Sequence, residues 1–473
     1  MAKGLAQPLS AAFGFSGFYT ANGMNADGGR WRDIVRHRPF GLVLLAIVAS
    51  RLWFALTFPV VQISDYEAYY DEARGFASLS ARGVTPFNSI GPKLFFSVWF
   101  RLFGDGLRGV GVANTFLYAA AVGLAYAGTM RAFGRTTAVV LSLVAFISLS
   151  ELYFINLACS EILGAFFVSW IYFLISAGSL SWRKVALVGF ASGLAVYNRS
   201  NILPTGLLVL VHELLMTRAV RPALMKAVAV QSITLGVTLP LCVFNLAHFG
   251  RFTPLIANAE ALWYGNNPKL SGDFHSYTKV PEDFPPGTPE REQLRREFSG
   301  FYLSPDRDLD FSSMNPYEVG DVKVRYALSW IGSEPGRYAH LIWARFQFLF
   351  FSCTYGEVPF RYYDADNPAQ PRWSPGHQRL IERARLPIRN LYQFLIAGAL
   401  VGLLITTFRD RTAFLLATTK GSALVIVAFY SAPFLLTAAA NRYHIPILTL
   451  AWVYLAHGTV LVGRGIRTRF RPT

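Results

Sequence analysis

Long apolar stretches, separated by short polar segments, run along most of the chain. A transmembrane helix needs about 20 predominantly apolar residues to cross the hydrocarbon core of a bilayer, and about ten stretches approach that length. The pattern predicts an all-α polytopic membrane protein. Its spans are expected near residues 39–62, 109–130, 136–156, 160–178, 185–198, 201–217, 227–249, 388–407, 421–440 and 443–462.

Clusters of basic residues set the expected orientation of these spans. Four arginines between residues 30 and 38 precede the first span, and cytoplasmic loops carry the excess of Lys and Arg in membrane proteins. Later basic groups alternate in agreement with this start. Both termini are therefore predicted in the cytoplasm, and the polar segments 63–92 and 250–387 are predicted outside.

The same pattern divides the chain into five parts. We expect a flexible cytoplasmic tail over 1–38, a transmembrane module over 39–249, an extracytoplasmic loop over 250–387, C-terminal transmembrane helices over 388–463 and a basic cytoplasmic tail over 464–473. The apolar stretch 341–353 is short for a span and contains Arg345. It is predicted as an interfacial or re-entrant helix.

Composition supports a surface covered largely by lipid. Apolar residues make up 53% of the chain and charged residues 15%, against about 25% charged residues in soluble domains. The net charge of +16 lies mostly in short clusters between apolar runs, which indicates membrane orientation and no nucleic-acid partner. Cys159, Cys242 and Cys353 lie far apart, so they imply neither a metal site nor a disulfide framework.

Two carboxylates are expected at the outer face of the bundle. Asp65 follows the first span and Glu161 opens the fourth. Charged groups near a bilayer usually face a bundle interior or an aqueous cavity, so the two acids predict a polar outer cavity. The alternatives are that Asp65 is a solvated loop acid and that Glu161 complements the dipole of a helix capped by Ser160.

Two arginines are expected at the same outer face, where the positive-inside rule predicts few basic residues. Arg199 ends the fifth span and Arg442 lies between the last two. A guanidinium group suits a phosphate, because its planar fork makes paired charge-assisted hydrogen bonds. Snorkelling of the side chains to the interface is the alternative.

A Trp-Tyr-Gly-Asn-Asn-Pro segment at residues 263–268 begins the large outer loop. Aromatic rings stack on the C–H faces of sugars and amides bind hydroxyl groups, so the segment is a candidate saccharide platform. Gly-Asn-Asn-Pro is equally an ordinary turn sequence.

In their order along the chain, these features resemble the GT-C superfamily of integral membrane glycosyltransferases. Within this superfamily, the features especially resemble the branch that contains the protein O-mannosyltransferases and the lipid A aminoarabinose transferase. The resemblance covers residues 40–462 and rests on Asp65, Gly91-Pro92-Lys93, Leu102-Phe103-Gly104, Ser160-Glu161, Asn198-Arg199-Ser200, residues 263–268 and Arg442-Tyr443-His444-Ile445-Pro446.

The resemblance implies a GT-C type transmembrane helix bundle with extracytoplasmic loops and interfacial helices. It also implies transfer of a hexosyl or pentosyl group from a polyprenyl-phosphate donor to a cell-envelope acceptor. The reaction would take place at the extracytoplasmic face of a bacterial inner membrane. A glycan or glycolipid acceptor is expected rather than a protein, because Tyr66 follows Asp65 where protein O-mannosyltransferases have a second acid.

The resemblance also implies roles for individual residues. Asp65 is the expected base of a single inverting displacement. Glu161 binds the acceptor, orients an arginine or shares a divalent cation with Asp65, and the sequence does not choose among these roles. The donor phosphate is expected at Arg199, Arg442 and Tyr443. Further substrate contacts are expected from Glu67, Tyr69, Lys93, Tyr264, Asn266 and Asn267.

Other functional classes are alternatives to this interpretation. A transporter or flippase of a lipid-linked saccharide needs similar outer arginines but no base, and it predicts polar residues along a path through the bilayer. Arg51 is the main charged residue within a span. A membrane acyltransferase needs an in-membrane histidine or serine system, and the histidines near span ends have no evident partner.

Overall fold

The computed structural model describes most of the chain, in two compact units, residues 1–41 and 42–473. The described residues are 38–80, 89–255, 259–270, 278–298, 309–352, 373–409, 418–437 and 442–469. Of the first unit only residues 38–41 are described, as the start of a helix. The contacts given below all lie in the second unit. The tail predicted over 1–38 and Cys353 fall outside the described residues, apart from Arg38 itself.

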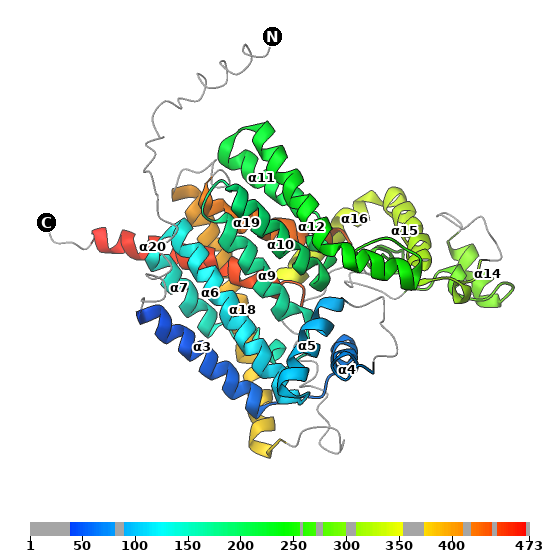
Figure 1. The fold of residues 1–473 in the computed structure, drawn as a ribbon, viewed down its shortest axis with the longest axis horizontal. Helices are drawn as coiled ribbons and strands as arrows, with labels where there is room; N and C mark the ends of the chain where they lie inside the picture. Colours follow the sequence, from blue (N-terminus) through cyan, green and yellow to red (C-terminus); the bar gives the residue numbers. More distant parts are fainter. Residues whose placement is uncertain are drawn as a thin grey trace, which may run out of the picture. The chain divides into compact units, whose positions relative to one another are not determined.

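The described part of the chain is helical and contains no strand (Figure 1). Seven of its helical segments are long and apolar enough to cross a membrane, so the chain is an all-helical integral membrane protein. They are α3 (Arg38–Thr57), α6 (Leu107–Phe133), η1 (Ser200–Ile202) with α11 (Thr205–Thr217), α12 (Val220–Phe249), α18 (Pro375–Arg409), η6 (Thr419–Gly421) with α19 (Ser422–Leu436), and α20 (Ile445–Arg469).

The remaining helices are shorter or less apolar. Three of them occupy stretches expected as spans: α7 (Arg135–Ile147), α9 (Ser160–Ile175) and α10 (Trp182–Asn198). Of two more, α4 (Asp65–Ala77) lies within the first predicted outer segment, and α5 (Ile90–Phe103) begins at the end of that segment and continues beyond it. The large polar segment contains α13 (Ala261–Gly265), η2 (Pro281–Asp283), α14 (Pro289–Glu297), η3 (Phe311–Ser313), α15 (Pro316–Ser333) and α16 (Pro335–Phe351).

The predicted span 136–156 is not one helix, because α7 ends at Ile147 and a short α8 (Leu152–Ile155) follows. Arg51 of α3 lies at the end of α7. Its guanidinium group donates to the carbonyl oxygens of Ala145, Phe146 and Ser148 at 3.1, 3.1 and 2.7 Å. The last carbonyls of a helix have no partner within the helix, so the guanidinium group of Arg51 stabilises the C-terminal end of α7.

The large polar segment has a small apolar core of its own. Trp263 of α13 packs against Phe298 and Tyr326, with ring centroids 5.7 and 5.6 Å apart. The Asn315 side chain accepts from the backbone N–H groups of Tyr317 and Glu318, and such caps stabilise a helix start. The contact between the rings of Trp263 and Tyr326 holds α15 against α13. The stretch 341–353, expected at the interface, lies mostly in α16, which is not among the seven long apolar segments.

The transmembrane helices pack closely where glycines face each other. α18 packs against α20, and a Cβ atom added to Gly458 would lie 2.5 Å from the Cα of Gly402. A Cβ at Gly402 would in turn overlap the carbonyl oxygen of Tyr454. Small residues allow helix backbones to approach closely within a bilayer, where van der Waals packing drives association. The helix that follows Arg442 is anchored in this way.

The glycine contact predicts a position-specific cost on α20. Gly458→Val should lower the unfolding midpoint of the purified protein in detergent, because overpacking a tight contact costs about 1–3 kcal/mol. Gly463→Val is the matched control on the same helix, since nothing lies within 4 Å of a Cβ added there. Equal midpoints for the two variants would show that the α18 and α20 backbones are not in contact.

Candidate active site

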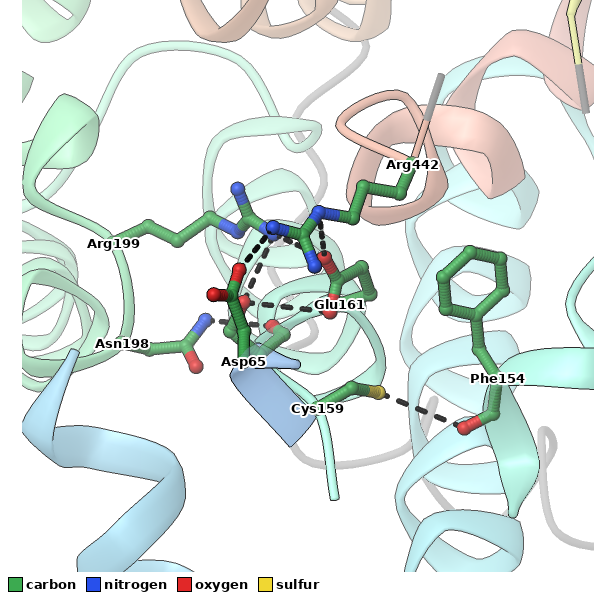
Figure 2. Close-up of polar contacts among 8 residues, drawn as sticks. Asp65, Phe154, Cys159, Glu161, Asn198, Arg199 and Arg442 are labelled. Atoms are coloured by element: carbon green, nitrogen blue, oxygen red, sulfur yellow. Dashed lines mark hydrogen bonds and ion pairs between the residues drawn. The ribbon is translucent and has the colours of Figure 1, made fainter. Parts of the chain in front are cut away.

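Two carboxylates and two arginines from distant parts of the chain converge at one place (Figure 2). Asp65 is the first residue of α4, and Glu161 lies in the first turn of α9. Arg199 directly follows α10, and Arg442 lies three residues before α20. The structure thus brings together the four charged residues that the sequence placed at one outer face.

Glu161 contacts both guanidinium groups. Its side chain is 1% exposed, and its Oε1 accepts from Nη2 of Arg199 at 2.8 Å. The same oxygen lies 3.6 Å from Nε of Arg442. In Figure 2 the two arginine side chains extend from opposite sides of the view, and their guanidinium groups meet beside this carboxylate. Among the roles left open by the sequence, these contacts are those of a residue that orients arginines.

The backbone around Arg199 is fixed by close packing. The Arg199 Nη2 also donates to Oγ of Ser160 at 2.9 Å, and Nδ2 of Asn198 donates to the Ser160 carbonyl oxygen at 2.9 Å. A Cβ added to Gly91 would lie 2.8 Å from the backbone of Asn198. The N-cap of α9 is Cys159, which makes no side-chain cap bond, so Ser160 serves the arginine instead of capping the helix.

Asp65 is the more accessible of the two acids. Its Oδ2 accepts from Nη2 of Arg442, and its side chain is 37% exposed. Ser64, the residue before it, has a φ angle of 56°. Few residues other than glycine adopt this left-handed region, and such outliers often occur at functional sites. Asp65 can therefore reach both Arg442 and solvent.

Aromatic rings support the guanidinium groups. The Tyr443 ring centroid lies 5.1 Å from Cζ of Arg199 and 5.6 Å from Cζ of Arg442. Tyr66 lies 5.5 Å from Cζ of Arg442, and Phe434 stacks on Tyr443 at 4.5 Å. Cations are attracted to the faces of such rings. The cage holds the two positive charges close together.

The tyrosines of α4 add no charge to this cage. Burial raises the pKa of Tyr66 well above its ordinary value, despite the nearby Arg442. Burial also raises the pKa of Tyr69 to about 12, with Glu161 adding to the shift. Both hydroxyl groups therefore stay neutral at pH 7. The site holds two positive and two negative side chains.

This set of groups suits an anion better than a metal ion. Both carboxylates, Asp65 and Glu161, are already paired with guanidinium groups. Two adjacent positive charges would repel a divalent cation. Over the residues that the structure describes, no three His, Cys, Asp or Glu side chains are grouped to hold a metal ion. The shared divalent cation considered for Asp65 and Glu161 does not fit this donor set.

An apolar pocket of about 410 Å³ adjoins the arginines. Its size is typical of small-molecule sites. Phe434 and Tyr443, whose rings face Arg199, form part of its wall. The remaining wall comes from Ser200, Asn201, Leu255, Ala259, Ala261, Leu262, Val324, Pro433 and Thr437. A ligand with an anionic head and an apolar chain would find both surfaces side by side.

Two predicted substrate contacts lie away from this cluster. Glu67 is exposed on α4, whereas Asp65 two residues earlier faces Arg442. Lys93 is fully buried and pairs with Glu72 at 2.8 Å, which ties α5 to α4. Tyr69 is the predicted contact that does lie near the cluster, because it is buried within the field of Glu161 and Arg199.

The amides of the 263–268 segment are structural, contrary to the expected saccharide platform. Asn266 Nδ2 lies within hydrogen-bond distance of the carbonyl oxygens of Leu262, Leu436 and Thr437, at 2.7, 3.3 and 3.1 Å. Its Oδ1 accepts from Arg345 at 2.9 Å. Asn266 is fully buried. No polar atom of its side chain is left to bind a sugar.

The neighbouring Asn267 and Tyr264 are engaged in the same way. Asn267 is fully buried, donates to the carbonyl oxygens of Trp263 and Tyr264, and accepts from Thr278. The Tyr264 hydroxyl lies 3.2 Å from Nζ of Lys323. These residues build the large polar segment, and the turn interpretation of the sequence describes them better than a sugar site.

Sequence reasoning missed two groups that shape the site. Phe434 stacks on Tyr443, yet nothing in the apolar run around it distinguishes it from a lipid-facing residue. Arg345 donates to Asn266, Gly265 and Leu435. The available signal in the sequence is an arginine within an apolar stretch. This signal argues against a membrane crossing, and it also indicates a side chain that binds buried polar groups.

No family model matches the chain, and no curated protein matches it. The chain is similar to the crystal structure of an oligosaccharyltransferase from Archaeoglobus fulgidus in complex with Zn and sulfate, with a TM-score of 0.48, 12% identity and coverage of 89% of this chain and 50% of that one. For the same enzyme tethered to an acceptor peptide containing the NVT sequon, the values are 0.44, 12%, 90% and 50%. For AglB from that organism with an inhibitory peptide and a dolichol-phosphate, they are 0.46, 12%, 91% and 52%. The chain spans about half the length of these proteins.

The burial of Glu161 predicts a large stability loss on its removal. Glu161→Ala should destabilise the protein by about 3–5 kcal/mol, because it leaves buried guanidinium charge without its partner. Asp105→Ala is the matched control: its pair with Arg74 is 2.6 Å long, but both side chains are 52% exposed. Exposed pairs contribute about 0–1 kcal/mol. Unfolding in detergent measures both losses, and equal losses would contradict the central position of Glu161.

Proposed function

We propose that the chain is a membrane glycosyltransferase of GT-C type. It would move a sugar from a polyprenyl-phosphate donor to a glycan or glycolipid acceptor at the extracytoplasmic face of the membrane. One observation carries the proposal: two guanidinium groups, held together by Glu161, lie between an apolar pocket and the accessible carboxylate of Asp65.

The donor chemistry fits the two surfaces of the site. A polyprenyl-phosphate sugar has an anionic phosphodiester joined to a long apolar chain. The planar forks of Arg199 and Arg442 suit the phosphate oxygens. The pocket beside Phe434 and Tyr443 suits the first isoprene units, because its walls are largely apolar.

The proposed reaction is a single displacement at the anomeric carbon. An acceptor hydroxyl oxygen forms the new bond to this carbon, and the bond from the carbon to the phosphate oxygen breaks with inversion. Asp65 takes the hydroxyl proton, and polyprenyl phosphate leaves with the bonding electron pair. Arg199 and Arg442 stabilise the charge that develops on the phosphate, and such preorganised donors are usually a large part of catalysis.

The pairing of Asp65 with Arg442 suggests an order of binding. The Oδ2 atom of Asp65 is engaged by Nη2 of Arg442. A donor phosphate on Arg442 would compete with Asp65 and release it toward the acceptor hydroxyl. The base would thus become available once the donor is bound.

The contacts of Arg51 support an enzyme over a transporter or flippase. A transport path needs polar groups across the bilayer, and Arg51 was the main candidate. Its terminal nitrogens instead bond three carbonyl oxygens at the end of α7. The charged groups of the proposed site lie near helix ends, as a reaction at one membrane face requires.

The assignment of Asp65 as base predicts a loss of turnover without loss of fold. Asp65→Asn should reduce release of polyprenyl phosphate by about 10²- to 10⁴-fold, the usual contribution of a general base. Mass spectrometry of purified protein with a panel of polyprenyl-phosphate sugars and glycan acceptors measures this release. Glu67→Gln, an exposed acid two residues away, is the control and should retain turnover. Near-normal turnover in Asp65→Asn would exclude Asp65 as the base.

Competition between Asp65 and the phosphate for Arg442 predicts that Asp65→Asn and Arg442→Ala change the affinity for polyprenyl phosphate in opposite directions. Asp65→Asn should bind polyprenyl phosphate about 2- to 5-fold more tightly, because a half-exposed ion pair is worth about 0–1 kcal/mol. Arg442→Ala should bind it about 10- to 100-fold more weakly, through loss of a charged hydrogen bond of about 1.5–3 kcal/mol. Equilibrium titration measures both. Weaker binding in Asp65→Asn would show that the acid does not compete with the phosphate.

A further inference from the structure

A second apolar pocket, of about 520 Å³, lies apart from the arginine cluster. Its walls come from α3, from α7 and α8 with the turn between them, and from the first half of α18. Nearly all of its wall residues are apolar, among them Phe54, Phe58 and Ile381. Arg51, in the same wall, has its terminal nitrogens bonded to carbonyl oxygens. Such a pocket fits a hydrocarbon chain.

The first half of α18 extends beyond the bilayer core. The helical segment Pro375–Phe408 has 34 residues, which at 1.5 Å per residue is about 51 Å, against about 30 Å of hydrocarbon. Between residues 375 and 391 the helix carries four arginines and one glutamate. This charged part therefore lies at the level of lipid headgroups, while the apolar part spans the core.

The arginines are arranged around the pocket stripe of α18. Leu380, Ala384, Ile388 and Leu391 line the pocket, and their spacing places them on one helix face. Arg383 and Arg385 are the immediate neighbours of Ala384 and flank this stripe on its two sides. Arg383 is exposed and Arg385 is half-buried. A basic side chain therefore lies on each side of the pocket stripe, where a lipid phosphate can bind.

The start of α18 is fixed, so the pocket has a defined end. Trp373 Nε1 donates to the carbonyl oxygen of Pro59 at 3.1 Å. The rings of Trp373 and His377 meet the Phe58 ring edge-on, with centroids 5.8 and 5.2 Å away. The charged segment is thus anchored to the end of α3 next to the pocket.

From this arrangement we infer that the protein holds an anionic phospholipid at this place. One acyl chain fills the pocket between α3, α8 and α18, and the phosphate binds beside the pocket stripe, at Arg383 on one side or Arg385 on the other. Charge selects the headgroup, because each basic residue near a membrane surface attracts anionic lipid. The pocket wall favours an acyl chain, because nearly all of the contacts that it offers are apolar. The inference does not depend on the enzymatic proposal.

Native mass spectrometry of the full-length, delipidated protein tests this site. Phosphatidylglycerol and phosphatidylcholine with identical acyl chains are added in equal amounts. We expect retention of one phosphatidylglycerol in preference to phosphatidylcholine. Ala384→Trp should abolish retention by filling the pocket, whereas Ala397→Trp, at an exposed position on the same helix, should not.

The headgroup contact is tested by two double variants of equal charge change. Arg383→Gln with Arg385→Gln should reduce the preference for phosphatidylglycerol by roughly tenfold. Arg379→Gln with Arg389→Gln should leave it, because positions five residues from Ala384 lie toward the other side of the helix. Equal losses in the two double variants would overturn the site in favour of general attraction. Should Ala384→Trp fail to fold, this comparison still decides.

Competition separates this site from the proposed donor site. Polyprenyl phosphate, added at increasing concentration, should bind without displacing phosphatidylglycerol. Displacement one for one would overturn the inference, because the pocket would then belong to the donor. Turnover without lipid retention would overturn the lipid site alone, and lipid retention without turnover would overturn the enzyme alone.

Discussion

Two guanidinium groups that lie side by side at a largely buried helix junction need an anion in contact with them. Two unit charges about 4 Å apart repel by about 4 kcal/mol at an effective dielectric constant near 20. Glu161 supplies the anion, with one oxygen in contact with Arg199 and close to Arg442. The acid is placed by the start of α9, and the arginines by the end of α10 and the turn before α20. One carboxylate therefore fixes how three helix ends meet.

Close packing makes this junction rigid. One turn after Glu161, a Cβ added to Gly164 would lie 3.1 Å from Pro446 and 3.2 Å from Nδ2 of Asn198. From the other side, Asn266 and Arg345 bind the last carbonyls of α19. These carbonyls lie within about one turn of Phe434, the residue whose ring stacks on Tyr443. The large polar segment thus acts on the site by holding the ring that supports both arginines, although its own amides do not face the cluster.

The sequence predicts the charged cluster well because topology alone brings it together. Asp65, Glu161, Arg199 and Arg442 each lie at the end of an apolar run, and alternation of the runs places these ends on one side. The sequence does not predict which groups are buried. An asparagine that binds a sugar and one that binds a carbonyl, as Asn266 does, have the same side chain. Likewise hydropathy continues through residues 136–156, and the carbonyl groups at the break after α7 are bonded by Arg51, far away in the chain.

The balance of charge gives a reason for two acids beside two arginines. In the proposed reaction the donor phosphodiester carries one negative charge, and the departing phosphate gains a second. At the same time Asp65 takes up a proton and loses its own charge. Negative charge thus passes from Asp65 to the phosphate, and Arg442 contacts the first and would contact the second. The total charge near the guanidinium groups stays constant, so the buried Glu161 and both arginines need not rearrange as the bond breaks, which is the property that a preorganised site requires.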